Sequence, residues 1–462
     1  MIGRRYEILC AVMLGFGHLS IMVGYDTESF VLESVIHSIH GREPDRIGRY
    51  AGYYGQAVMY VAYVIGCLFS PSILNEIGSK PILIIAAFCF TSFPLGFLFT
   101  NSYYYYLSAI VLGIGYSLYY QGNGGYMTSH STRETISSNV NIAWSVGCCC
   151  LILGSGILAG MSHLSENDPV GISNVTEVLE NGMTERLFSN FEITLLFGAF
   201  TAIGVLAIIN FSLIPSKEVE NCIQSNKKKG SFVDELALTC RTLVAPGVLQ
   251  LFPLFFILGI SSSFVLSIFP TAMNFNKNNT NMKFLLPCFS LGIGISEVLT
   301  GLFLTYMSKK VKDFCMVPTM FIGTLFTITY SILIHLSTPF EAPIVPTAEE
   351  PILFQQTYLN IFILAIIIGI GDCCFNTCRS VICAVAMPDR KAQVFSISKL
   401  YQAIGSGTLF FLSPVLKLYW YTVGIPILSV TAMYFFYIVA RRTQNMERKL
   451  TVAEEKEIEA KL

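Results

Sequence analysis

Apolar residues gather along this chain into long runs that short polar segments separate. We count twelve runs of about twenty residues, the length that an α-helix needs to cross a bilayer. Because the bilayer core offers no partners to backbone N–H and C=O groups, such runs are expected to be helical throughout. The predicted fold class is therefore all-α, a polytopic membrane protein with these approximate spans: 6–25, 50–70, 81–99, 103–122, 140–161, 192–213, 246–270, 284–307, 315–336, 357–379, 393–414 and 419–440.

The composition agrees with a membrane protein and excludes several function classes. Of the 462 residues, 53% are hydrophobic and 13% are charged, whereas a soluble domain carries about 25% charged residues. The hydrophobic composition makes the lipid bilayer the expected surroundings, and a net charge of −1 gives no overall field that would attract nucleic acid. No nucleophile elbow, phosphate-binding loop or zinc-protease motif occurs, so we do not expect an enzyme. The 14 cysteines have no histidine at ligand spacing, so neither a metal site nor a cofactor is expected.

Basic residues predict the orientation in the membrane. With the N-terminus in the cytoplasm, about three quarters of the 29 Lys and Arg residues fall on the cytoplasmic side. Both termini are then cytoplasmic, and the choice between plasma membrane and an internal membrane stays open. N-glycosylation sequons at Asn174 and Asn278 fall in predicted exterior loops, where glycosylation is expected.

Two polar segments divide the chain. Loop 162–191 is predicted to be exterior, and segment 214–245 separates spans six and seven on the cytoplasmic side. Glycine-containing stretches recur at equivalent positions on both sides of this segment, which favours duplicated six-helix units. The predicted organisation is an N-terminal six-helix bundle (1–213), a cytoplasmic linker (214–245), a C-terminal six-helix bundle (246–440) and a cytoplasmic tail that extends the last helix (441–462).

Span ten carries the clearest candidate site. Asp372, Asn376 and Arg379 are spaced by four and three residues, so they lie on one face of a helix. A carboxylate inside a bilayer costs several kcal/mol unless it is paired or faces water, and such a residue therefore indicates a functional site. Arg379 lies close to the predicted membrane face, where its side chain is expected to snorkel to the interface.

Two further charges lie at a depth similar to that of Asp372. Lys399 in span eleven and Glu297 in span eight both fall in the cytoplasmic half of the membrane. Because buried charge must be compensated, we predict that Lys399 pairs with Asp372 or Glu297. Two interpretations stay open: a carboxylate that exchanges a proton or coordinates a cation during transport, and a fixed ion pair that joins spans eight, ten and eleven.

The outer end of span one is acidic. Asp26, Glu28 and Glu33 follow the apolar run directly. We interpret this stretch as a solvated loop helix, and the alternative is a vestibule that attracts cations.

Motifs in the second half resemble those of the Unc-93-like family of the major facilitator superfamily. Four stretches are similar to its G-x-x-x-G-E…G…S-K, D-A-P-I-x-P, G-x-G-D-x-C-F-N-T and F-x-I-F-K-x-x-Q patterns, in that order: Gly292–Lys309, Glu341–Pro346, Gly369–Thr377 and Phe395–Gln402. The turn after span two also resembles the short-loop signature of the superfamily, with Asn75 in place of an Asp. The likeness covers most of the chain and is strongest to the short orphan major-facilitator-domain branch.

This resemblance implies two six-helix bundles around a central cavity lined by spans one, four, seven and ten. It makes Asp372, Asn376, Glu297 and Lys399 matched positions, and it adds Gln402 and Asn123 as candidate solute- or ion-binding residues. It implies a transporter-like protein that moves an unknown small solute or ion by alternating access. The alternative is an accessory subunit of another membrane protein, because some relatives regulate two-pore potassium channels or assist the trafficking of innate immune receptors.

Overall fold

The structure is all-α, as predicted. The computed structural model describes residues 2–99, 101–132, 135–166, 188–220, 222, 230–311, 313–385, 387 and 390–459. In these residues β-structure is limited to one bridge, between Asn276 and Thr347. The helices are, in chain order, α1 (Ile2–Arg42), α2 (Ala51–Ile77), α3 (Ser79–Gly96), η1 (Phe97–Phe99), α4 (Ser102–Ser129), α5 (Ile136–Gly147), α6 (Cys150–Glu166), α8 (Asn190–Leu213), α9 (Phe232–Leu243), α10 (Pro246–Gln250), α11 (Phe252–Ser263), η2 (Phe264–Ile268), α12 (Phe269–Phe275), η3 (Lys277–Asn279), α13 (Leu285–Lys310), α14 (Val317–Ser337), α15 (Tyr358–Val385), α16 (Lys391–Leu412) and α17 (Leu418–Glu459).

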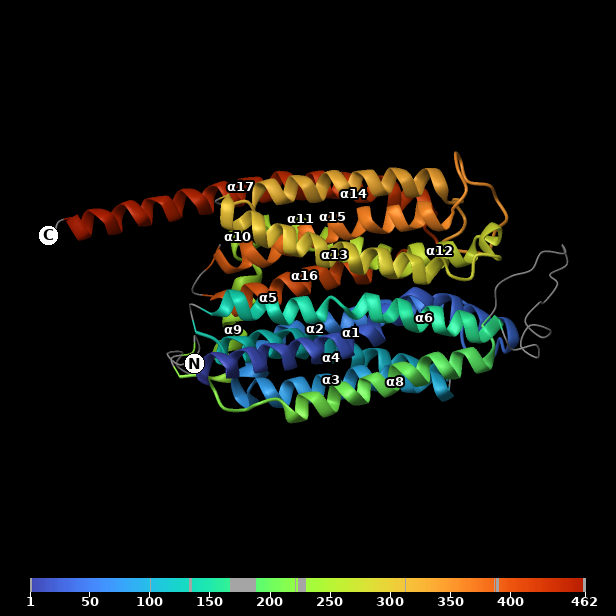
Figure 1. The fold of residues 1–462 in the computed structure, drawn as a ribbon, viewed down its shortest axis with the longest axis horizontal. Helices are drawn as coiled ribbons and strands as arrows, with labels where there is room; N and C mark the ends of the chain where they lie inside the picture. The colour runs from blue at the N-terminus through green and yellow to red at the C-terminus, as the bar shows by residue number, and fades with distance from the viewer. Residues whose placement is uncertain are drawn as a thin grey trace.

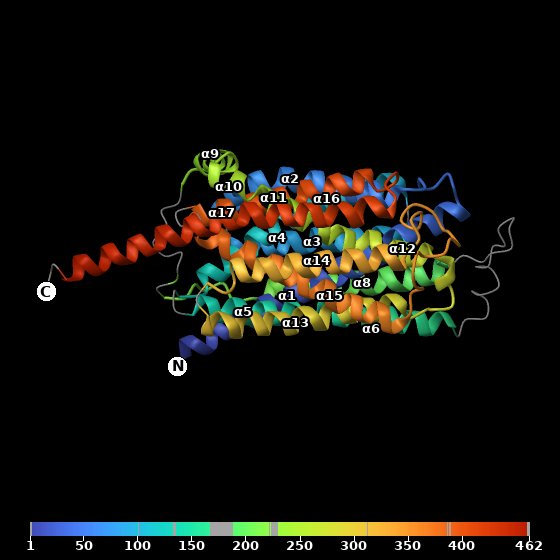
Figure 2. The same cartoon turned by 90° about the horizontal axis from the view of Figure 1, so that it is seen from above.

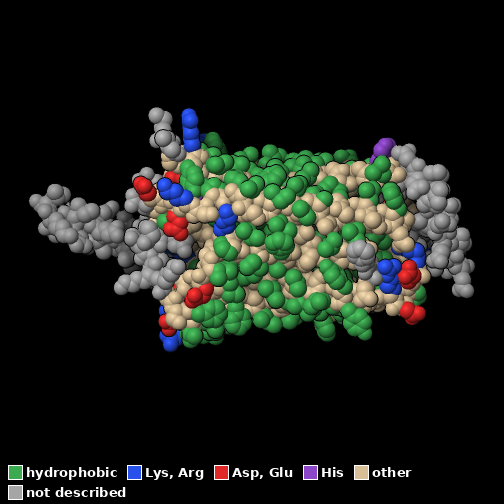
Figure 3. Space-filling view, turned by 90° about the horizontal axis from the view of Figure 1, so that it is seen from below, with side chains coloured by type: hydrophobic (Ala, Val, Ile, Leu, Met, Phe, Trp, Pro, Cys, Tyr) green, Lys and Arg blue, Asp and Glu red, His purple; other side chains and the backbone are tan. Residues whose placement is uncertain are grey.

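Each of the twelve predicted spans falls on one of these helices or on consecutive ones. By length and composition, 10 helical stretches among the described residues are apolar enough to cross a membrane. Helices α4 and α16 do not meet this measure, because polar residues such as Asn123 and Lys399 interrupt them. Figure 3 shows apolar side chains along the middle of the visible face, with charged side chains mostly near its two ends, as a bilayer requires.

The helices run side by side along the long axis of the molecule, and both termini lie at the same end (Figure 1). We call this the terminal end and the opposite one the far end. Helices α1 to α8 form one layer, here called the N-terminal half, and α10 to α17 form a second layer, the C-terminal half (Figure 1). Their boundaries as separate bundles, at residues 213 and 246, stay a prediction. Helix α17 continues into the predicted tail as a single helix that projects beyond the bundle (Figure 1).

Glycines allow the closest helix contacts in both halves. A Cβ on Gly113 of α4 would lie 2.1 Å from the carbonyl oxygen of Met59 in α2. A Cβ on Gly259 of α11 would lie 1.9 Å from the carbonyl oxygen of Gln402 in α16. Small residues let helix backbones approach in this way inside a membrane, where packing drives helix association. The second contact fixes the position of Gln402 relative to span seven.

The predicted linker contains a helix that the apolar pattern did not reveal. Helix α9 crosses the bundle direction at the terminal end and is seen nearly end-on in Figure 2. The side-chain amide of Asn75 donates to the carbonyl oxygen of Gly230 just before α9, at 2.7 Å. On the other side, Gln393 of α16 donates to Glu235 of α9, at 2.7 Å. Helix α9 therefore joins the terminal ends of α2 and α16.

The two halves touch most extensively along two seams, and α1 also packs against η2 and α12. The first is formed by α2 and α16, which pack along their length. At one end of this seam the rings of Tyr53 and Phe410 are in contact. At the other end Ser396 donates a hydrogen bond to the carbonyl oxygen of Cys67, at 2.7 Å. The second is formed by α6 and α13. There Ser290 donates to the carbonyl oxygen of Leu151, at 2.9 Å.

Candidate functional site

The polar face predicted on span ten exists, and two of its members bind each other. Asn376 donates from Nδ2 to Oδ2 of Asp372 at 2.7 Å, one helical turn away on α15. Ser262 of α11 donates to Oδ1 of the same carboxylate at 3.4 Å. Asp372 and Asn376 are both half-buried. The Asp372 carboxylate therefore has a donor on each oxygen and keeps part of its surface exposed.

The predicted ion pair of Lys399 is absent from the described residues, so that prediction is wrong. Within the described ranges, its ammonium group has no carboxylate oxygen within 4.0 Å. Instead, Nζ lies 3.6 Å from the ring centroid of Tyr120 in α4. A desolvated ammonium over a tyrosine ring is stabilised by the negative face of that ring. Asp372 acts on Lys399 through its charge only, without direct contact.

Arg379 corrects a second prediction, because it does not snorkel to the interface. Its side chain is 4% exposed, and Nη1 donates to Oε1 of Gln402 at 2.7 Å. Its guanidinium also lies 5.9 Å from the ring centroid of Phe395. Helix α15 continues to Val385, so Arg379 lies deeper than the predicted end of span ten suggested. Arg379 and Gln402, a candidate from α16, therefore belong to the same buried group.

Glu297 and Asp26 complete a central cluster of charges. The charges of Asp372 and Asp26 both act on Glu297 of α13, and those of Asp372 and Lys399 act on Asp26 of α1. Among the described residues, the Cys150 thiol donates a hydrogen bond to Oδ2 of Asp26, with the sulfur 3.7 Å away. Both carboxylates are half-buried. Asp26 was not among the candidate binding residues, because the apolar run of span one ends before it.

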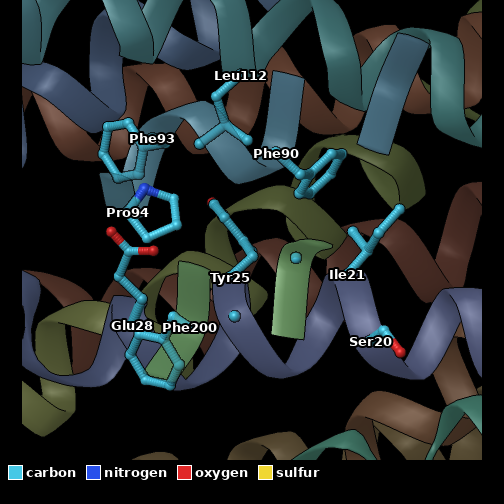
Figure 4. A pocket seen from close by; sticks show the side chains of 11 residues that line it. Ser20, Ile21, Tyr25, Glu28, Phe90, Phe93, Pro94, Leu112 and Phe200 are labelled. Atoms are coloured by element: carbon cyan, nitrogen blue, oxygen red, sulfur yellow. The ribbon is translucent and has the colours of Figure 1, made fainter. Parts of the chain in front are cut away.

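The rest of the acidic stretch on α1 is buried, so its interpretation as a solvated loop helix is wrong. Helix α1 extends to Arg42, and Glu28 and Glu33 are 3% and 1% exposed. Glu33 accepts a hydrogen bond from the backbone N–H of Tyr53 at 2.9 Å. Glu28 lines a cavity with room for about one water molecule, among apolar residues that include Phe93 and Phe200 (Figure 4).

Asn123, the candidate from α4, belongs to a chain of hydrogen bonds beside the central cluster. It donates to the hydroxyl of Tyr119 at 2.8 Å, and that hydroxyl shares a 2.5 Å hydrogen bond with Nδ1 of His18. The charge of Lys399 acts on His18. The structure therefore places Asn123 on the N-terminal side of the cluster, one turn along α4 from Tyr120, and gives it no direct contact with the charged residues.

Of the two glycosylation candidates, one lies within the described residues. Asn278 is exposed at the far end of the molecule, where its side-chain amide donates to the carbonyl oxygen of Glu349 at 3.4 Å. Asn174 lies outside the described residues. Modification of either residue stays a prediction.

The described residues include no group of three or more His, Cys, Asp or Glu side chains arranged to hold a metal ion. The central cluster instead mixes three carboxylates with two cations from four helices of both halves. Such a mixture can bind a polar or charged solute through hydrogen bonds and charge, without a metal.

The cluster lies between ends of the molecule that differ in closure. At the far end, Asn274 of α12 donates to Ser34 of α1 at 3.0 Å, and Tyr53 of α2 donates to the carbonyl oxygen of Pro343 at 2.8 Å. Two glycines on α13 compare how closely the halves approach along the second seam. A Cβ on Gly294 would lie 3.0 Å from Ile152 of α6. A Cβ on Gly301, which is nearer the terminal end, would have Cys373 of its own half as its one described neighbour, at 4.0 Å. The second seam is therefore packed at the far end and looser at the terminal end.

Solved structures share this fold. The chain superposes on the peptide transporter POT with a TM-score of 0.65 and 10% identity, covering 95% of each chain. It superposes on the xylose transporter XylE from E. coli, in a partially occluded inward-open conformation, with a TM-score of 0.61 and 13% identity, covering 93% of this chain and 97% of XylE. At such identities the likeness shows the fold alone, which is that of the major facilitator superfamily.

Relatives in sequence identify the family. The UNC93-like protein MFSD11 of Xenopus tropicalis is 21% identical and matches over 95% of this chain and 98% of its own length. Protein unc-93 homolog A of Danio rerio is 20% identical, over 92% and 90%. The model of a family described as "Ion channel regulatory protein UNC-93" matches residues 43–437. This match spans most of the sequence, and the chain therefore belongs to the UNC-93 family.

Proposed function

We propose that the protein is a solute transporter that works by alternating access and binds its solute at the central cluster. The observation that carries this proposal is the convergence of half-buried charges from both halves, Asp26 on one side and Glu297 and Asp372 on the other. In transporters of this kind the solute binds near the middle of the membrane, between halves that rock around it. A cluster shared by both halves would change its geometry with that motion.

The uneven seam supports a definite starting state. Contacts at the far end join α1 and α2 to the C-terminal half, whereas a Cβ on Gly301 of α13 would have no atom of the described N-terminal half within 4 Å. With the termini in the cytoplasm, as the basic residues predict, the protein is in an inward-facing state. In the proposed cycle the seam closes at the terminal end and opens at the far end.

A flux measurement tests this proposal. Purified protein in liposomes is screened with a broad panel of labelled solutes under a pH or Na⁺ gradient. We expect saturable uptake of at least one solute, and at least a tenfold loss of uptake in Asp372→Asn, because the amide cannot supply the charge that the cluster shares. The control is Glu350→Gln, an exposed acid of the far end, which should transport normally.

A second candidate function follows from the family description, which names ion-channel regulation. In that case the protein is an accessory subunit of another membrane protein and moves no solute. The two functions predict opposite results in the same preparation. Absence of flux across the panel, together with a membrane partner recovered in fixed stoichiometry, would overturn the transporter proposal.

A further inference from the structure

The central cluster contains buried donors without acceptors. Lys399 is 4% exposed, and its ammonium has the Tyr120 ring as its contact and no hydrogen-bond acceptor among the described residues. Arg379 is equally buried, and its Nε also lacks an acceptor there. An unpaired buried donor costs about 1 to 3 kcal/mol, and more when it is charged. These groups are therefore expected to bond to something that enters the cluster.

The same cluster contains acceptors without strong donors. The described residues give the Asp26 carboxylate a thiol contact at 3.7 Å, and they give the Glu297 carboxylate no side-chain donor. Asp372 differs, because Asn376 and Ser262 already donate to its two oxygens. The acceptors come from α1 and α13, whereas the donors come from α15 and α16.

We infer that the ligand of this site is a small zwitterion that carries both a cationic donor group and an anionic acceptor group. This inference rests on the proposed function, because it names the class of solute that the proposed transporter would bind. The cationic group would bind between Asp26 and Glu297, and the anionic group would bind to Lys399 and the Nε side of Arg379.

The unpaired donors and acceptors argue against a ligand with one kind of charge. A simple cation would leave the Lys399 ammonium and the Nε of Arg379 without acceptors among the described residues, and a simple anion would meet three carboxylates. A zwitterion satisfies both sets and adds no net charge to a site inside the membrane. A ligand bound to both the acceptors and the donors would also connect α1 of the N-terminal half with α13, α15 and α16 of the C-terminal half.

The test uses the purified full-length protein in detergent and measures binding directly by calorimetry. The first probes are leucine, isoamylamine and isocaproate, which share one carbon skeleton and differ in whether they carry both charges, the cation or the anion. A series of α-, β- and γ-amino acids, each tested beside the corresponding amine and carboxylate, varies the size of the ligand and the distance between its two charges. We expect at least one zwitterion to bind at least tenfold more tightly than either of its single-charge fragments.

Variants then assign the two ends of the ligand. Asp26→Asn and Lys399→Gln should each weaken zwitterion binding about tenfold or more, and Glu297→Gln repeats the first test from α13 if Asp26→Asn does not fold. The matched controls are Glu43→Gln, an exposed acid just beyond α1, and Lys391→Gln, an exposed lysine on α16; both should bind normally.

The outcomes separate this inference from the proposed function. An amine or a carboxylate that binds as tightly as its parent zwitterion, or a series in which no zwitterion binds, overturns the inference. Zwitterion binding without flux in liposomes leaves the inference standing and overturns the transporter proposal. Flux of solutes that carry a single charge, without zwitterion binding, overturns the inference and leaves the transporter proposal standing.

Discussion

Two groups of carboxylates lie inside this membrane protein, and they differ in what surrounds them. Glu28 and Glu33 are almost fully buried within the N-terminal half, among apolar side chains and one backbone donor. Asp26, Glu297 and Asp372 are half-buried, come from both halves, and share their space with Lys399 and Arg379. The first group lies deeper, yet the second has the features of a binding site. The difference between the two groups is therefore the convergence of charges of both signs from both halves, and not the depth of burial.

The largest effect on stability is expected from Arg379→Ala. This change leaves Oε1 of Gln402 without its donor and removes a cation whose charge acts on Asp372. We expect a loss of about 3 kcal/mol in the free energy of unfolding, measured by denaturant titration in detergent. Arg441→Ala, which removes an exposed arginine over the Tyr437 ring, should cost less than about 0.5 kcal/mol. Equal losses in the two variants would show that Arg379 does snorkel to the interface.

A smaller loss is expected from Gly52→Ala, which tests the packing around Glu33. The added Cβ would lie 2.2 Å from Oε2 of Glu33 and 2.9 Å from its Cα, so either the carboxylate or helix α1 must move. We expect a loss of about 2 kcal/mol by the same titration, and unchanged binding at the central cluster. In Gly48→Ala the added Cβ meets no atom within 4 Å, and stability should be unchanged. Loss of binding in Gly52→Ala would show that the two groups of carboxylates are coupled, and would contradict their separation.

The smallest effect, and one of opposite sign, is expected from Glu28→Met. Oε1 of Glu28 has no hydrogen-bond partner among the described residues, and most of the cavity wall is apolar. Replacing an unpaired buried carboxyl group with an apolar side chain of similar length should raise the free energy of unfolding by about 1 kcal/mol. Glu28→Gln should gain less, because its amide also lacks partners. A loss of stability in Glu28→Met would instead show that the Glu28 carboxyl group makes a stabilising polar interaction, and that Glu28 resembles the central group.

The sequence predicted what depends on periodicity and span length. The Asp372–Asn376 contact follows from the spacing of four residues on one helix, and the all-α fold follows from the apolar runs. The partner of Lys399 could not be predicted, because it depends on how α4 places the Tyr120 ring beside α16.

Helix ends were the other source of error. Asp26 was separated from the site because the apolar run stops at Tyr25, although α1 continues for four more turns to Arg42. Arg379 was placed at the membrane face for the corresponding reason, since polar residues in α15 hide its last turns. Polar residues that line the interior of a membrane protein weaken the same hydropathy signal that defines its spans.

The π-helical turn η2 has a consequence for movement in span seven. It lies between α11, which holds Ser262 against Asp372, and α12, which binds α1 at the far end. A π-turn contains one residue more than the α-helical turn it replaces, so its conversion to α-helix would rotate one flanking segment against the other by about 100°. Such a rotation would exchange the side chains that α12 presents to α1 while α11 keeps its hold on the carboxylate. In the proposed transport cycle, this rotation at η2 is one way for α12 to separate from α1 at the far end.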